Sequence, residues 1–121
     1  MSTGDPRRID VTGRMTIEAP GSSRIAELSL RIDQRADGRQ TTGAFRLADP
    51  GAGVELEMAE SGLVQTAPGW AAWSGMARVV PTGALRAVTV IVDGFPQSQE
   101  RPDRTVVVST GDGYRVSGVL R

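Results

Sequence analysis

The sequence predicts an all-β protein, a single antiparallel β-barrel or sandwich of about eight or nine strands with meander-like connections. Apolar and polar residues alternate along most of the chain, as they do in strands that bury one face. The 15 glycines and 7 prolines are spread as separate turn signals rather than gathered in one tract. No segment with helical periodicity reaches the length of a typical helix.

The N-terminal half of the chain predicts four strands that follow a flexible arm at residues 1–8. The strands cover residues 9–18, 26–33, 41–48 and 54–58, and each places apolar side chains at alternate positions. Turn-forming residues separate them at residues 19–23, 36–38 and 49–53. The Asp37-Gly38 pair supplies the positive φ that a tight hairpin requires. Consecutive strands are therefore expected to be neighbours in space.

The C-terminal half predicts the remaining strands, at residues 62–66, 70–80, 85–93, 104–110 and 114–120, of which the first is short and weak. The strand at 85–93 is apolar on both faces, so we expect it to be central or covered on both sides. Asp93-Gly94 predicts a turn that opens a polar loop through Pro102, and residues 111–113 predict another hairpin. Gly75 and Gly118 predict bends or bulges. Residues 9–121 are thus expected to form one barrel domain.

The charge balance argues against nucleic-acid binding. The chain carries 14 basic and 14 acidic residues, which give a formal net charge of zero and form no basic stripe that could neutralise phosphates. Every basic residue is an arginine, which we interpret as the mark of a GC-rich coding genome. A functional choice of arginine for anion binding is the alternative, with a lumen lined by the strand arginines. These are Arg31, Arg46, Arg78, Arg86 and Arg115, and a solvated outer face is the simpler place for them.

Missing residue types remove most catalytic chemistry. The chain has no histidine, cysteine or lysine. It therefore lacks a Ser-His or Cys-His nucleophile pair, an imidazole base, the usual zinc ligands and a Schiff-base or phosphate-loop lysine. We expect no cofactor and no metal, and the sequence favours a protein that is not an enzyme.

A carboxylate-based hydrolase is the remaining enzymatic alternative. Glu55 and Glu57 lie two positions apart on an expected strand, so they point to one face about 6.8 Å apart at ~3.4 Å per residue. That distance suits the paired carboxylates of inverting glycoside hydrolysis. The simpler interpretation places Val54, Leu56 and Met58 in the core and both glutamates in solvent.

Three aspartates offer a second acidic cluster. Asp93, Asp103 and Asp112 could gather at one end of a barrel and bind calcium through their oxygens. Two of them precede glycine, so a role in turns is sufficient to account for them.

Aromatic residues give the most suggestive candidate site. Two tryptophans stand within four residues in a chain with two Trp, one Tyr and two Phe. At a barrel mouth they could stack on a sugar ring or a hydrophobic ligand, with arginines supplying polar contacts. The candidate ligand-binding residues are Trp70, Trp73, Tyr114, Phe45, Met58, Arg78 and Arg115. In the simpler interpretation Trp73 fills the core and Trp70 plugs one end.

Residues 73–120 resemble a known class of barrel. The segment reads Trp-Ser-Gly-x-Ala-x-Val, then Gly-Ala-Leu-Arg-x-Val-Thr-Val-x-Val-Asp-Gly, and closes with Gly-Tyr-x-Val-Ser-Gly-x-Leu. These motifs resemble small lipocalin-like β-barrel modules of bacterial secreted and surface proteins. The resemblance implies the barrel fold and carries no catalytic motif. The chain departs from the pattern at Ala77, where a second glycine is common, and it has no export signal.

These observations favour a non-catalytic β-barrel module that acts through protein contacts or self-association. A small barrel that binds a hydrophobic ligand or a sugar is the alternative. No apolar run approaches the ~20 residues that span a bilayer, and the N-terminus lacks the apolar region of a signal peptide. We therefore expect a cytoplasmic protein, or a secreted one if the chain is a fragment of a longer protein.

Overall fold

Eight antiparallel strands close into a single β-barrel in the computed structural model, which describes residues 7–19, 21–34, 41–67, 69–80, 82–95 and 104–120. The strands are β1 (Arg7–Ala19), β2 (Ser22–Gln34), β3 (Thr41–Asp49), β4 (Val54–Ala67), β5 (Gly69–Val79), β6 (Leu85–Phe95), β7 (Arg104–Thr110) and β8 (Arg115–Leu120). Each strand pairs with the next one along the chain, and β8 returns to β1. The predicted all-β meander is confirmed, and it is a barrel rather than a sandwich.

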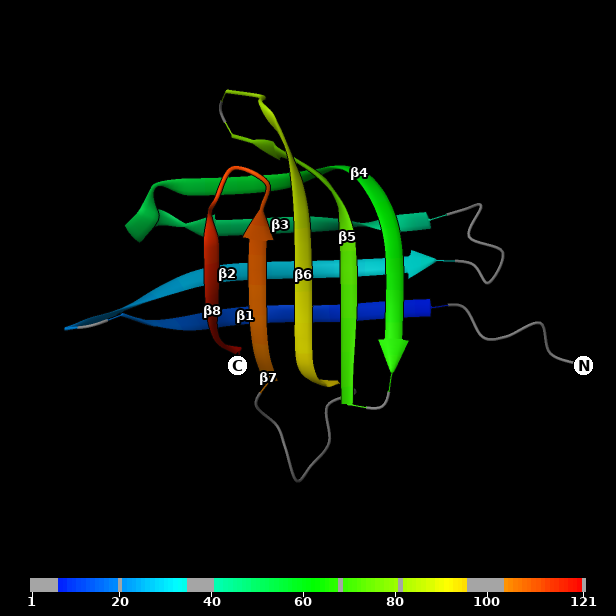
Figure 1. Ribbon diagram of the computed structural model, residues 1–121, viewed down its shortest axis with the longest axis horizontal. Helices are drawn as coiled ribbons and strands as arrows, with labels where there is room; N and C mark the ends of the chain where they lie inside the picture. The colour runs from blue at the N-terminus through cyan, green and yellow to red at the C-terminus, as the bar shows by residue number, and fades with distance from the viewer. Residues whose placement is uncertain are drawn as a thin grey trace, which may run out of the picture.

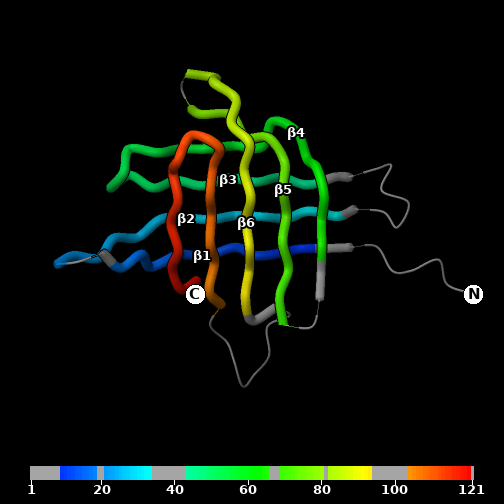
Figure 2. The backbone as a smooth tube through the Cα atoms, in the orientation of Figure 1, coloured from blue at the N-terminus to red at the C-terminus, as the bar shows by residue number. Residues whose placement is uncertain are grey.

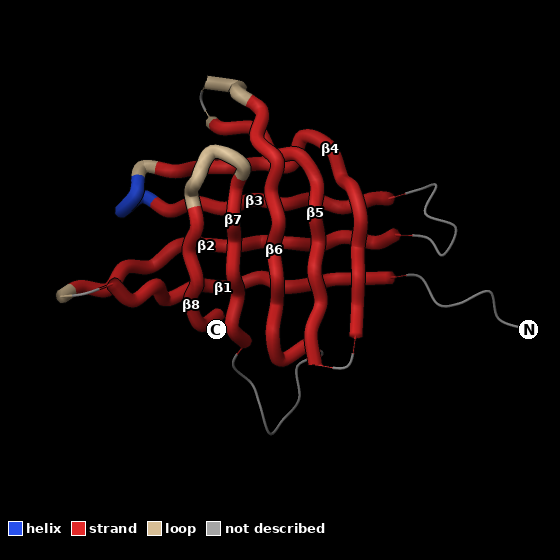
Figure 3. Tube along the Cα trace, viewed as in Figure 1, coloured by secondary structure: helices blue, strands red, loops and turns tan. Residues whose placement is uncertain are grey.

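The barrel consists of two layers of strands that cross each other. β1, β2 and β3 form one layer, and β5 to β8 form the other (Figures 1 and 2). The described chain is strand almost throughout, and its one helical turn is the 3-10 helix η1 (Pro50–Ala52) after β3 (Figure 3). β1 begins at Arg7, so it includes two residues of the segment expected as an arm. Residues 1–6 and the Asp37-Gly38 hairpin lie outside the described residues.

β4 belongs to both layers because it bends sharply at its middle. It pairs with β3 through residues 54–57 and with β5 through residues 56–67, with register shifts after Met58 and after Ser61. Extra residues in one strand bend it and increase its twist. The bend also needs close backbone approach, since a Cβ at Gly62 would lie 2.5 Å from the Ser74 carbonyl oxygen. The separate strand expected at residues 62–66 is wrong: these residues continue β4 beyond its bulges.

Gly75 faces this corner from β5. A Cβ there would lie 2.5 Å from the Glu60 carbonyl oxygen and 2.7 Å from Cζ2 of Trp73. The irregularity that this glycine predicted is present, although the extra residues stand on β4 rather than on β5. Glycine is therefore required where the two strands come closest.

Alternating side chains from all eight strands fill the barrel. Alternation places apolar residues such as Val11, Leu30 and Val90 inside, where each is fully buried. The rings of Phe45 and Trp73 contact each other at the centre, with centroids 5.2 Å apart and planes tilted by 37°. The indole Nε1 of Trp73 donates a hydrogen bond to Ser61 Oγ at 2.9 Å. Every buried side-chain nitrogen and oxygen in the described part of the chain has a hydrogen-bond partner.

β6 is central, as one of the two expected alternatives had it, because it pairs with both β5 and β7, but it is not covered on both sides, and the turn expected at its end is wrong. Leu85 is 53% exposed and Ile91 is 42% exposed, so one face of this strand is open rather than covered. β-branched residues favour the extended backbone whichever way they face, so an apolar run does not prove that both faces are buried. The strand also continues through Gly94, because Trp70 pairs with Asp93 and Gly69 pairs with Phe95. Gly94 is thus an extra residue in a bulge instead of a turn residue.

The hairpin predicted at residues 111–113 is confirmed. The Thr110 amide donates to the Tyr114 carbonyl at 2.8 Å, and Gly113 adopts φ +100°. A side chain rarely tolerates that φ, so glycine is needed at this turn. The turn places Tyr114 directly before β8.

Candidate functional site

A buried carboxylate joins three distant parts of the chain. Asp49, at the end of β3, is the one buried charged residue of the described chain, with no exposed surface. Arg24 of β2 donates from Nε to Oδ1 at 2.8 Å and from Nη2 to Oδ2 at 3.0 Å. The Tyr114 hydroxyl donates to Oδ2 at 2.7 Å. We call these three residues the clamp.

The clamp fixes the protonation states of its members. Burial by itself raises the pKa of the Asp49 carboxyl, but the hydrogen bonds from Arg24 and Tyr114 outweigh it and hold this pKa below its usual range. Burial and the hydrogen bond to Asp49 raise the pKa of the Tyr114 hydroxyl well above its usual range. Neither group is poised to exchange a proton near neutral pH, which a general acid or base requires. The clamp therefore ties strands together rather than performing acid–base chemistry.

The turn that contains η1 is shaped to receive the arginine. A Cβ at Gly51 would lie 2.6 Å from Cδ of Arg24, so only glycine leaves room for the side chain as it stands. The sequence identified this segment only as a turn, and it identified Tyr114 only as a ligand candidate. Nothing local connects Arg24, Asp49 and Tyr114, because their contacts are made across the barrel.

The candidate ligand-binding residues do not form one pocket. Trp73 is buried in the core, as the simpler interpretation predicted, Phe45 is buried beside it, and Met58 packs against the core partly buried. Trp70 is 37% exposed and, by alternation with the buried Ala71, faces outward from β5. Tyr114 belongs to the clamp.

The two candidate arginines also lie on the outside of the barrel. Arg78 forms an ion pair with Glu57 at 3.3 Å, and Arg115 is exposed on β8. The candidate set is thus divided among the core, the clamp and the outer surface.

The acidic candidates lie on the outside as well. Glu57 pairs with Arg78, and Glu55 pairs with Arg46 at 2.9 Å, with both carboxylates at least 40% exposed. Each faces an arginine in solvent rather than its neighbour across a cleft. The arrangement supports the interpretation in which the glutamates are solvated.

The proposed gathering of aspartates at one end is wrong for the two that are described. Asp93 pairs with Thr105 near the start of β7, whereas Asp112 follows Thr110 in the turn after its end. Hydrogen bonds from Thr110 and Arg86 lower the pKa of Asp112 to about 2. Asp103 lies outside the described residues. Among those the structure describes, no three acidic side chains come together to hold a metal ion.

The outer surface of β5 to β8 differs in charge from that of β1 to β3. Outward residues of β1 to β3 include seven charged ones: Asp10, Arg14, Glu18, Glu27, Arg31, Asp33 and Arg46. The central outward residues of the other layer carry no charge: Ala72, Ser74, Thr89, Ile91, Val107, Ser109 and Ser117. We call this second set the uncharged face. The sequence-based prediction missed this face because it considered only the apolar runs of the C-terminal strands.

The uncharged face is ordered in rows across the strands. One row runs Ala72, Ile91, Val107 and Ser117, and the next runs Ser74, Thr89 and Ser109 and ends at Arg115 on β8. Ile91 is the most exposed large side chain of these rows. Because the rows follow the strand pairing, the surface is regular, and the nearest exposed charges are Arg115 at the end of the second row and Asp93 in the row beside Ile91.

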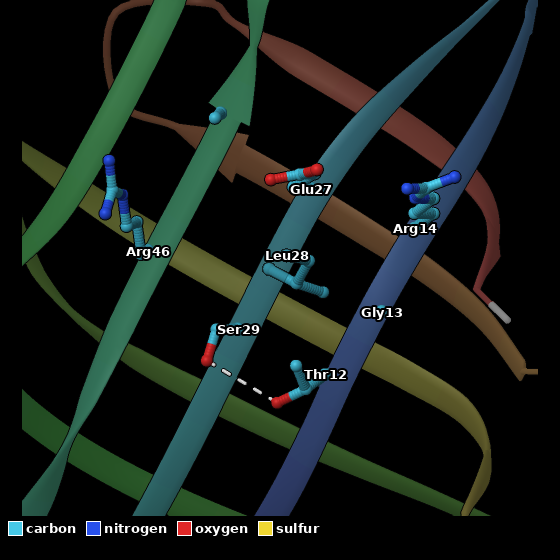
Figure 4. Close-up of a pocket in the computed structure, with 8 residues that line it drawn as sticks. Thr12, Gly13, Arg14, Glu27, Leu28, Ser29 and Arg46 are labelled. Atoms are coloured by element: carbon cyan, nitrogen blue, oxygen red, sulfur yellow. Dashed lines mark hydrogen bonds between the residues drawn. The ribbon is translucent and has the colours of Figure 1, made fainter.

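Two hollows on the outer surface of the described residues are candidate binding sites. One of about 370 Å³ lies over β1, β2 and β3, with Arg14 and Arg46 on opposite sides of β2 and Glu27 between them (Figure 4). In its floor the hydroxyls of Thr12 and Ser29 are 3.5 Å apart. A larger hollow of about 520 Å³ lies where β8 meets β1, and it is lined by Thr16, Glu18, Thr105, Ser117, Gly118 and Val119.

The described residues contain no helix of the length and apolar character needed to cross a membrane. Comparison of the chain with protein-family models, with curated proteins and with solved structures gives no match.

Proposed function

We propose that this protein is a non-catalytic β-barrel module that self-associates through its uncharged face. The observation that carries the proposal is the contrast between the two layers. Seven outward residues of β5 to β8 form two ordered uncharged rows bordered by Arg78, Asp93 and Arg115, whereas the outward residues of β1 to β3 include seven charged ones of both signs. Depletion of charge at the centre of a surface is typical of protein interfaces.

A second copy of the chain is the partner that this surface suits best. An uncharged sheet face has no charge pattern to match, so another uncharged sheet face is complementary to it, and a two-fold axis would bring the same patch of both copies together. The formal net charge of zero also means that two copies do not repel each other at long range.

The size of the face sets the expected strength. Four strands ~4.8 Å apart and two outward rows, about four residues along each strand, cover ~260 Å² on each copy. Two such faces bury ~520 Å², which is below the ~1,000 Å² that a stable specific interface exceeds. We therefore expect a weak, reversible dimer with a dissociation constant on the order of 10–100 μM.

The interior supports this proposal over a ligand-binding barrel. The candidate residues Phe45 and Trp73 contact each other, and the indole nitrogen is already bonded to Ser61. A ligand site normally offers polar groups that await a partner. In the described part of the chain, all buried side-chain polar atoms are already paired.

Sedimentation equilibrium over a range of protein concentrations tests the proposal. Ile91→Arg places a charge at the centre of the uncharged face and should abolish the dimer. Thr12→Arg adds the same charge to the outer surface of β1 and should leave the dimer intact. A wild-type chain that stays monomeric at about 1 mM, or an Ile91→Arg variant that dimerises like the wild type, would overturn the proposal.

A further inference from the structure

The barrel is closed by a very short seam. β1 and β8 share two residue pairs, Met15 with Leu120 and Thr16 with Val119, whereas β1 and β2 share thirteen. Gly118 allows this contact, because a Cβ there would lie 2.4 Å from the Thr16 carbonyl oxygen. The close approach is thus confined to one corner.

Beyond Thr16 the two strands separate. β1 continues through Ala19 in pairing with β2, and this hairpin extends past β8 and away from the barrel (Figures 1 and 2). β8 meanwhile turns along β7, with which it forms six residue pairs. The hollow of about 520 Å³ lies in the angle between them, and we call it the seam cleft.

The seam cleft has the size and the walls of a binding site for a strand. Its volume lies within the range of ligand sites, and Ser117, Gly118 and Val119 of β8 form one wall, about 10 Å long at ~3.3 Å per residue. Two of its lining residues, Ser117 and Gly118, have small side chains or none. The backbone of the wall is therefore within reach of an entering chain.

Backbone chemistry determines what the cleft would bind. In an antiparallel ladder each strand directs alternate N–H and C=O groups to its two sides. Residues 115–118 use one side for β7, and the pairing with β1 involves Val119 and Leu120 on the other. A strand edge of this kind is a template for another extended chain.

We propose that the seam cleft binds an extended peptide, which adds as a strand antiparallel to residues 115–118 of β8. Among the residues that line the cleft, Glu18 alone is charged, and Arg115 lies at the far end of the β8 segment, so a basic side chain of the peptide should lie beside Glu18. The cleft shares Ser117 with the uncharged face, so the test below also uses a variant in which self-association is blocked.

Backbone-selective peptides test the proposal. The probe is a capped, fluorescent pentapeptide of alternating Val and Arg, and its control has the same side chains with alternate amides N-methylated. Binding is followed by fluorescence anisotropy, and its location by amide chemical shifts of the ¹⁵N-labelled protein. We expect saturable binding, shifts centred on residues 17–19 and 115–118, and about tenfold weaker binding of the methylated peptide, as for two lost hydrogen bonds.

Two charge-reversal variants test whether Glu18 contributes to peptide binding. Glu18→Arg should weaken binding about fivefold or more, whereas Glu27→Arg, the same change on the outer surface of β2, should not. The proposal is overturned if the methylated peptide binds equally well, if the shifts map to another surface, or if nothing binds at about 1 mM. Running the titrations on the Ile91→Arg variant as well separates this result from self-association.

Discussion

Replacing Asp49 by Asn tests the energetic role of the clamp. The carboxylate has no exposed surface and accepts three hydrogen bonds, two of them from Arg24. Hydrogen bonds to charged groups contribute ~1.5–3 kcal/mol each. Arg24 keeps 32% of its side-chain surface exposed, so water replaces part of what it loses. We expect the free energy of unfolding to fall by about 2–4 kcal/mol, which lowers the melting temperature by about 8–16 °C.

Urea unfolding followed by tryptophan fluorescence measures this loss, because Trp73 is fully buried in the native barrel. Asp112→Asn is the matched control: its carboxylate also faces an arginine and a hydroxyl, but in solvent. Exposed pairs contribute little, so this variant should unfold close to the wild-type midpoint. Equal losses in the two variants would refute the reasoning, since burial would then make no difference.

Three further predictions concern pH and the seam. The folded pKa of Asp49 lies below its unfolded value. Its stabilising contribution is therefore present above the unfolded pKa of ~3.9 and is lost as the pH falls below that value. The free energy of unfolding should therefore fall more steeply with acid in the wild type than in Asp49→Asn. Tyr114 is the one tyrosine of the chain, and its pKa is raised. Ultraviolet absorbance of the folded protein should therefore show no phenolate at pH ~10. A phenolate signal at that pH would contradict the hydrogen bond from Tyr114 to Asp49. Gly118→Ala should lower the urea midpoint strongly, because its Cβ would meet the Thr16 carbonyl oxygen at 2.4 Å. Gly111→Ala should leave the midpoint unchanged, because the nearest atom to its Cβ would be 3.7 Å away.

The strands and the core could be predicted from the sequence because their signal is local. Alternation in residues such as Ile9, Leu28 and Phe45 fixes which side chains point inward, and all three are buried. Turns rich in glycine fix the order of the meander. The alternation fails for Ile91, since a β-branched residue suits both the inner and the outer face of a strand.

The clamp and the bend of β4 could not be predicted, for a different reason. Tyr114 meets Asp49 across 65 positions of sequence, and no local pattern records such a contact. The bend depends on where β4 leaves β3 for β5, which shows as register shifts only once both partners are known. A glycine such as Gly62 indicates a bulge or bend in a strand, but it does not show which strand carries the extra residue.

The short seam has a consequence for how this barrel folds. Every other strand pairing joins neighbours in sequence, so the hairpins can form early and independently. The seam joins Met15 to Leu120, and closing a loop of about 100 residues carries a large entropic cost. Closure adds only two residue pairs of strand pairing, which offset little of that entropic cost, so ring closure is expected to come last in folding. Separation of β8 from β1 is therefore the smallest opening of the native barrel. The amide hydrogens of Thr16 and Val119 should exchange with solvent sooner than that of Val90.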